Sequence, residues 1–243
     1  MGFILGTIKI IFVLGFLVFI HEGGHFLVAR ACEVKVKEFA IGFGPIIFSR
    51  KGEFTKYSVR LIPFGGFVDM VGENERKDEE GSFSNALVWK RILIVAAGAI
   101  VNIVFALIVF FLLILITKNN FSEALNQTGR FFISVIESLI ELFKGNVSLN
   151  EMAGPIGISE IIVKTDTVYN FIYLISLISI SLGVTNLLPI PALDGGRIFL
   201  LIIEAIRKKP LKEDFENKIQ MIGFLLIITL AIIISFNDII RIF

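Results

Sequence analysis

The sequence predicts a membrane protein with an all-α core of four transmembrane helices and a small membrane-associated β-sheet after the first of them. Of the 243 residues, 55% are hydrophobic, and the mean hydropathy of +0.84 is far above that of a soluble domain of this size. The apolar residues gather in four stretches that are long enough to cross a bilayer. Between the first two, residues 33–71 lack helical periodicity and are rich in glycine and aromatic residues.

The four apolar stretches lie at about residues 3–28, 92–116, 168–190 and 219–236. The first has the composition of a signal peptide, but it continues directly into His21 without a small-residue cleavage site. We therefore expect a retained span, and we expect all 243 residues to form a single domain built on four spans.

Lys and Arg are unevenly distributed among the connections between these spans. They are abundant from Arg30 to Arg91 and from Arg197 to Lys218, and sparse between the second and third spans. The positive-inside rule then places the first and third connections in the cytoplasm and both termini outside. The net charge of only +1 gives no basic field for nucleic acid, so we expect no nucleic-acid partner.

The region of residues 33–71 predicts several short strands with sharp bends. Its glycines, at Gly42, Gly44, Gly65 and Gly66, favour such bends, and its aromatic side chains suit a membrane interface. An open edge of this sheet can pair with an extended peptide, which makes the four glycines candidate peptide-binding positions. The alternative is a plain cytoplasmic hairpin.

Two further segments complete the expected organisation. Residues 122–144 carry apolar side chains every three to four positions and predict an amphipathic helix on the outer membrane surface or packed on the protein. Residues 152–158, rich in glycine and proline, interrupt the pattern before the third span. In the second span, Gly98 and Asn102 are interpreted as helix-packing positions.

The end of the first span carries the sequence His21-Glu22-Gly23-Gly24-His25. On a helix, residues four apart face the same side, so both imidazoles can share a metal ion. Glu22 lies beside them, where it can take a proton from an attacking water. The alternative is a pair of interfacial histidines, but this leaves unexplained why the only two histidines adjoin a membrane-length apolar run.

A third ligand is expected from residues 186–196, which contain two prolines and two glycines and cannot continue a regular helix. Irregular backbone at membrane depth is tolerated where it lines a watery cavity. Asp194, the only acidic residue of this segment, supplies the ligand that the histidine pair lacks. A zinc ion would balance the charges of Asp194 and Glu22. The alternative is that Asp194 caps the helix that follows.

These motifs together resemble the site-2 protease family of intramembrane zinc metalloproteases, in particular its bacterial branch, the regulator of sigma-E protease-like enzymes. The resemblance rests on H-E-G-G-H at residues 21–25, on the glycine-rich region after it and on N-x-x-P-x-P-x-L-D-G-G at residues 186–196. The motifs G-P-I-G at residues 154–157 and F-N-D at residues 236–238 extend it over nearly the whole chain.

The resemblance implies zinc as the cofactor, with His21, His25 and Asp194 as its ligands and Glu22 as the catalytic glutamate. It also implies that Asn186 contacts the substrate backbone. Two departures stand out. Relatives carry one or two PDZ domains between the second and third spans, where this chain has only a short connection, and Gly98-Ala99 replaces the usual Gly-Pro.

By this resemblance we expect a zinc-dependent endopeptidase in the cytoplasmic (inner) membrane of a bacterium, embedded in the lipid bilayer. Its expected substrates are single-span membrane proteins such as anti-sigma factors, or signal-peptide remnants, cut within or beside their transmembrane segments. Two alternatives remain open from the sequence. One is an inactive relative that binds transmembrane peptides without cutting them, and the other is a small ion transporter with metal-independent flux.

Overall fold

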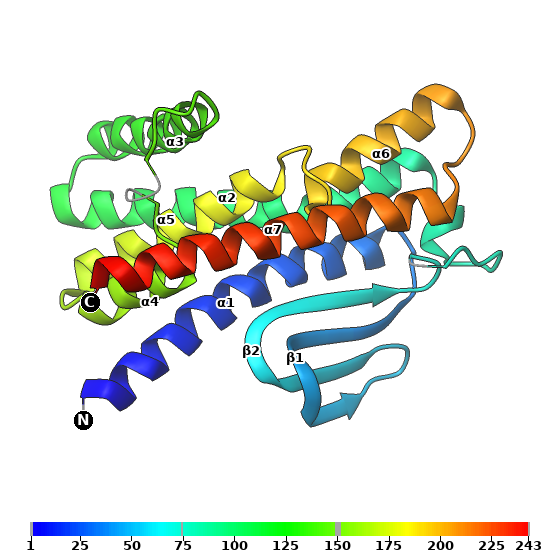
Figure 1. The fold of residues 1–243 in the computed structure, drawn as a ribbon, viewed down its shortest axis with the longest axis horizontal. Coiled ribbons are helices and arrows are strands. Elements are labelled where there is room, and N and C mark those ends of the chain that lie inside the picture. Colours follow the sequence, from blue (N-terminus) through cyan, green and yellow to red (C-terminus); the bar gives the residue numbers. More distant parts are fainter. Residues whose placement is uncertain (1, 74, 149–151, 243) are drawn as a thin grey trace. The chain divides into compact units, whose positions relative to one another are not determined.

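Helix α1 spans Gly2–Ala31 in the computed structural model, which describes residues 2–73, 75–148 and 152–242 (Figure 1). Within these residues, four helices are long and apolar enough to cross a membrane, as predicted. They are α1, α2 (Val88–Lys118), α5 (Val168–Asn186) and α7 (Glu213–Ile242).

The ends of two of these helices differ from the predicted ends. Helix α5 stops at Asn186 rather than near residue 190, because prolines 189 and 191 cannot supply the backbone donors that a continuing helix needs. Helix α7 starts at Glu213, before the predicted residue 219. Its first turn holds three acidic residues, which stabilise the positive end of the helix dipole.

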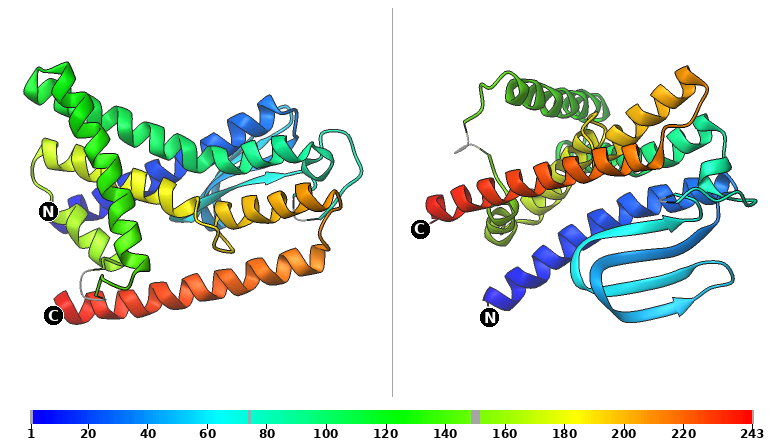
Figure 2. Two further views of the ribbon diagram at one scale, coloured as in Figure 1. Left: turned by 90° about the horizontal axis from the view of Figure 1, so that it is seen from above. Right: turned by 45° about the vertical axis from the view of Figure 1, so that its right-hand side comes forward.

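The predicted sheet follows α1, but it consists of two long bent strands rather than several short ones. Strand β1 (Val36–Lys51) pairs antiparallel with β2 (Lys56–Met70). Residues 38–41 of β1 have partners in both the second half and the first half of β2, so each strand passes through the sheet twice (Figures 1 and 2).

Glycines make these bends possible. Gly42, Gly44 and Gly65 have φ values of 87°, 82° and 91°, in the left-handed region that a residue with a Cβ rarely adopts. Three of the four glycines singled out in the sequence therefore shape the strands. Among the described residues, 66–70 pair with β1 on one side only and form a free edge of the sheet.

The chain forms two compact units. The first comprises Met1–Ile10, Ile103–Val184 and Phe224–Phe243, and the second comprises Ile11–Asn102 and Thr185–Gly223. All predicted site residues belong to the second unit.

In the first unit, the predicted amphipathic helix is α3 (Phe121–Phe143). The side chain of Asn120 caps it by accepting a hydrogen bond from the Glu123 backbone N–H, at 3.0 Å. Its inner face contributes Phe131, whose ring stacks on that of Phe110 of α2 with centroids 4.2 Å apart. The amphipathic pattern thus reflects packing on the protein, one of the two placements expected.

The segment predicted to interrupt the pattern begins another helix, α4 (Pro155–Lys164). Proline is tolerated at the first helical position because its missing N–H has no helical partner there. The Gly157 N–H, which has no partner within the first turn of the helix, donates to the buried Asp238 carboxylate of α7 at 2.8 Å. The sequence reading missed this helix because the capping group is distant in the sequence.

In the second unit, α1, α2, the sheet and α6 (Asp194–Arg207) share one hydrophobic core. A short 3₁₀ turn, η1 (Phe83–Asn85), contributes Phe83 to it. Two buried charges, Arg91 of α2 and Glu204 of α6, form an ion pair that joins these helices.

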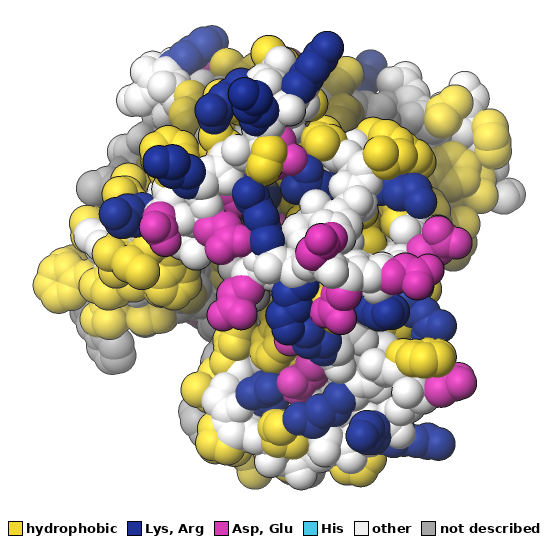
Figure 3. All heavy atoms as spheres, turned by 90° about the vertical axis from the view of Figure 1, so that its right-hand side faces the viewer, with side chains coloured by type: hydrophobic (Ala, Val, Ile, Leu, Met, Phe, Trp, Pro, Cys, Tyr) yellow, Lys and Arg dark blue, Asp and Glu magenta, His cyan; other side chains and the backbone are white. Residues whose placement is uncertain are grey.

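Acidic and basic side chains gather together on one face of the molecule, flanked by apolar side chains (Figure 3). Ion pairs of the second unit include Arg76 with Glu213 at 3.9 Å and Lys37 with Asp69 at 3.7 Å. A face of mixed charge suits water or lipid headgroups rather than hydrocarbon.

Candidate metal centre

Helix α1 brings the two histidines to one side, one turn apart. The Nε2 atoms of His21 and His25 are 3.2 Å apart, and both residues are buried. The alternative of two interfacial histidines does not account for this convergence, because separate interfacial imidazoles would turn their nitrogens to water or headgroups.

Asp194, the first residue of α6, completes the cluster. Its Oδ2 lies 3.2 Å from His21 Nε2 and 3.5 Å from His25 Nε2. Among the described residues, these are the three side chains whose ligand atoms converge closely enough to hold a metal ion. The capping alternative finds no support, because the N-cap of α6 is Leu193 and no side chain caps it.

The donor set fits zinc. Zinc–ligand bonds of about 2.0–2.1 Å in a tetrahedron separate neighbouring ligand atoms by about 3.3 Å, close to the distances found here. Asp194 Oδ2 is buried and has no hydrogen-bond partner in the described part of the chain, as expected of an atom that serves as a metal ligand. Burial raises the pKa of Asp194, but the two imidazoles outweigh this and lower it to about 2, so the ligand is ionised.

The outer nitrogens of both imidazoles meet groups of α2. His25 Nδ1 donates to the Ile94 carbonyl oxygen at 2.8 Å, which leaves Nε2 free for a metal. His21 Nδ1 lies 3.3 Å from the side-chain amide of Asn102, which is fully buried. A metal-bound His21 carries its proton on Nδ1, and the Asn102 oxygen accepts it once the amide is turned to face the ring.

Asn102 is therefore a site residue that the sequence reading assigned to helix packing. The signal that could have identified it is its spacing from Gly98. The two residues are four apart on α2 and share the face that meets the histidines.

Glycines let α1 and α2 approach closely at this point. A Cβ on Gly98 would lie 2.3 Å from His25 Nε2, and one on Gly24 would lie 2.7 Å from the Ala97 carbonyl oxygen. A Cβ on Gly23, between the same histidines, would meet nothing within 4 Å. Gly98 is a packing position, as interpreted from the sequence, and the group that packs against it is the ring of the candidate ligand His25.

Glu22 is not among the three converging ligands, and it lies against the sheet. A Cβ on Gly66 would come within 3.0 Å of Glu22 Cγ, so the free edge of β2 passes beside this carboxylate. Of the four candidate glycines, Gly66 is thus the one brought to the site. Asn186 ends α5, and its side-chain amide has no hydrogen-bond partner among the described residues.

An ion pair connects the end of the sheet to the helix of Asp194. The Glu73 carboxylate, with 9% of its side chain exposed, accepts a hydrogen bond from the Met70 backbone N–H at 3.2 Å and pairs with Arg197. Arg197 lies one turn after Asp194 on α6. This pair was not identified from the sequence, because its partners are far apart in the chain.

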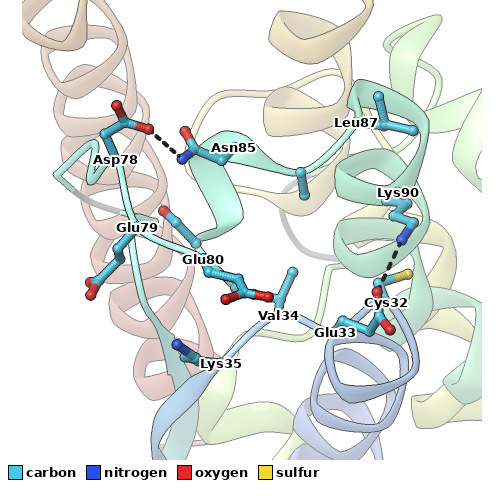
Figure 4. A pocket seen from close by; sticks show the side chains of 13 residues that line it. Cys32, Glu33, Val34, Lys35, Asp78, Glu79, Glu80, Asn85, Leu87 and Lys90 are labelled. Atoms are coloured by element: carbon cyan, nitrogen blue, oxygen red, sulfur yellow. Dashed lines mark hydrogen bonds and ion pairs between the residues drawn. The ribbon is translucent and has the colours of Figure 1, made fainter.

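A cavity of about 670 Å³ lies elsewhere in the second unit (Figure 4). It is lined by charges of both signs, among which Lys90 lies 3.9 Å from Glu33, and by the single cysteine, Cys32. No candidate metal ligand lines it, so the cavity does not form part of the metal centre.

Comparisons with known proteins indicate the family of this chain. The sequence model of peptidase family M50 matches residues 9–230. A protein of Clostridium acetobutylicum, named as a candidate zinc metalloprotease, is 27% identical over 93% of this chain and 95% of its own length. Zinc metalloprotease RasP of Bacillus licheniformis is 25% identical over 98% of this chain and 99% of its own. Regulator of sigma-W protease RasP of Bacillus subtilis is 24% identical over 99% and 100%.

These relatives are longer than this chain. The alignments run over 321, 416 and 421 residues, whereas the chain has 243, so the relatives contain segments that it lacks.

Proposed function

The chain belongs to peptidase family M50, the site-2 proteases, and from this premise we propose that it hydrolyses peptide bonds within or beside transmembrane segments of single-span membrane proteins. As a family member with four apolar helices, it is a multi-pass membrane zinc metalloprotease. The observation that carries the proposal is the convergence of His21, His25 and Asp194 beside Glu22 and a free sheet edge.

We assign His21 Nε2, His25 Nε2 and Asp194 Oδ2 as the zinc ligands. When bound, zinc acts as a Lewis acid that activates water and polarises the scissile carbonyl. The Ile94 carbonyl and the Asn102 amide hold the two rings with Nε2 facing inward.

Glu22 is the general acid and base of this scheme. Its carboxylate takes a proton from the attacking water and returns it to the leaving amine, so the peptide bond breaks as the new acid and amine form. The Glu22 side chain lies against Gly66 of the sheet edge. A peptide bound at that edge therefore lies near the Glu22 carboxylate.

The free edge of β2, residues 66–70, is the proposed substrate-binding strand. A transmembrane helix hides its own backbone, so it must unwind before it can be cut. Main-chain hydrogen bonds to an edge strand hold an unwound segment extended and compensate for the helical bonds it has lost. The amide of Asn186, which has no hydrogen-bond partner among the described residues, is suited to a further backbone contact. Gly42, Gly44 and Gly65 keep the strands bent.

The family suggests the substrate class, and the charge distribution suggests the orientation in the membrane. We propose anti-sigma factors or signal-peptide remnants as substrates, in the inner membrane of a bacterium. The connections rich in Lys and Arg face the cytoplasm and both termini lie outside. A name such as regulator of sigma-W protease, carried by a relative, supports the first of these substrates.

The test compares the detergent-purified protein with its Glu22→Gln variant on a panel of single-span membrane proteins. We expect about one zinc per chain in both proteins, since the variant keeps all three ligands, and cleavage by the parent alone. Glu33→Gln serves as the control, because the Glu33 side chain is 88% exposed, pairs with Lys90 and is not one of the converging metal ligands. Cleavage by the Glu22→Gln protein at the parental rate would contradict the assignment, and cuts confined to soluble segments would contradict the substrate class.

A further inference from the structure

The turn that precedes Asp194 has an unfavourable backbone conformation. Ala192 has a φ of 73°, in the left-handed region, where a Cβ crowds the neighbouring carbonyl. The turn also sets where α6 begins, since the Leu193 N–H donates to the Ile190 carbonyl at 3.1 Å and the Gly196 N–H to the Leu193 carbonyl at 3.1 Å. The position of the Asp194 carboxylate therefore depends on this turn.

Two residues of α7, three positions apart on one face, contact the turn. The Ala192 N–H donates to Gln220 Oε1 at 2.5 Å. At Gly223 the backbones are so close that a Cβ would lie 2.3 Å from the Pro191 carbonyl oxygen. Both contacts lie within the second unit.

The Gln220 amide is held in one orientation at a cost. Its oxygen must face the Ala192 N–H, because the reverse orientation would set two donors against each other. Its Nε2 is then buried without a hydrogen-bond partner in the described part of the chain. A left-handed alanine and an unpaired buried donor therefore meet at one turn. Such unfavourable features persist where the surrounding structure enforces a functional geometry.

We propose that Gln220 is a positioning residue for the zinc ligand Asp194. By accepting the Ala192 N–H it holds the turn in its left-handed conformation, which keeps Asp194 Oδ2 within reach of the two histidines. The proposal rests on the proposed function in that Asp194 is a ligand. It adds that the last transmembrane helix controls the geometry of the metal centre, so that a shift of α7 that breaks this hydrogen bond loosens the zinc site.

The test uses two substitutions of similar size. Gln220→Met removes the acceptor, and Gln220→Glu keeps an acceptor while removing the unpaired donor. The readouts are the zinc dissociation constant, from competition with a chelator, and the visible absorption of the cobalt-loaded protein, which reports ligand geometry. We expect zinc binding to weaken about 10- to 100-fold in Gln220→Met, with a changed cobalt spectrum, and to stay near the parental value in Gln220→Glu.

A third substitution distinguishes the turn from a general packing effect. Glycine adopts positive φ without strain, so Ala192→Gly should hold the turn without help from Gln220 and should restore most of the zinc affinity to Gln220→Met. The control is Gln127→Ala on α3, which removes an exposed amide that donates to Glu123. Parental zinc affinity and cobalt spectrum in Gln220→Met would overturn the proposal, and so would failure of Ala192→Gly to restore them. Absence of zinc binding by the parent itself would instead overturn the proposed metal centre.

Discussion

The two halves of the metal centre are built in different ways. On α1, His21 and His25 come together because a regular helix sets residues four apart on one side, and the neighbouring α2 needs only to leave room and orient the rings. Asp194 reaches the same point from an irregular turn with a left-handed alanine, which contacts Gln220 of α7, a side chain whose Nε2 is buried without a partner among the described residues. One half depends on helical periodicity, and the other depends on tertiary contacts.

This difference separates what each half can tolerate. The histidine half should be sensitive to anything that occupies the space between α1 and α2, and indifferent to contacts made elsewhere. The aspartate half should respond to the contacts that hold the turn and α6 to segments far away in the sequence, such as those of Gln220 and Arg197.

Gly98→Ala should abolish zinc binding and activity. Its new methyl group would lie 2.3 Å from His25 Nε2, the atom that we assign to the metal, so the buried ring would have to leave its position beside the other ligands. Gly23→Ala, between the histidines and free of contacts within 4 Å, should retain both. Metal analysis of the two purified proteins decides, and zinc at parental content in Gly98→Ala would show that the helices do not need this close approach.

Asn102→Leu should weaken zinc binding about 10- to 100-fold without changing the helical content. The substitution removes the amide that orients His21 and puts an apolar side chain of similar size in the same fully buried position. The measurement is the zinc dissociation constant. Thr117→Val near the end of α2 is the control, because among the described residues the Thr117 hydroxyl bonds only to carbonyls of its own helix. An unchanged constant would return Asn102 to a packing role.

The sequence was sufficient for the parts that follow periodicity and local chemistry. The four spans, the amphipathic α3 and the shared face of His21 and His25 follow from apolar runs and helical spacing. The long bent strands, helix α4 and the contacts of Gln220 were not predicted, because each depends on a partner far away in the chain. A glycine in the sequence does not by itself indicate whether a strand bends or ends at that residue.

The Glu73–Arg197 ion pair tests whether the substrate edge and the metal centre are linked. Arg197→Met should raise KM for a peptide substrate more than it lowers kcat, because it leaves the Glu73 carboxylate without its partner and releases the end of β2 from α6. Glu73→Gln keeps the hydrogen bond from the Met70 N–H and should have the smaller effect on KM. Steady-state kinetics of both variants decide, and a loss confined to kcat would place the effect at the metal instead.

The smallest effect concerns the sheet, away from the metal centre. Burial raises the pKa of Glu38, but hydrogen bonds from Ser58 and Arg60 outweigh it and hold the pKa below its ordinary value of 4.5. A carboxyl with a lowered pKa in the folded state stabilises the fold above its unfolded pKa, and this contribution disappears as the pH falls through the folded value. The unfolding midpoint should therefore drop as the pH is lowered below about 4.5, and Glu38→Gln should be less stable than the parent at pH 7 and show less of this dependence. An equal acid-induced drop in both proteins would assign the effect to carboxylates other than Glu38.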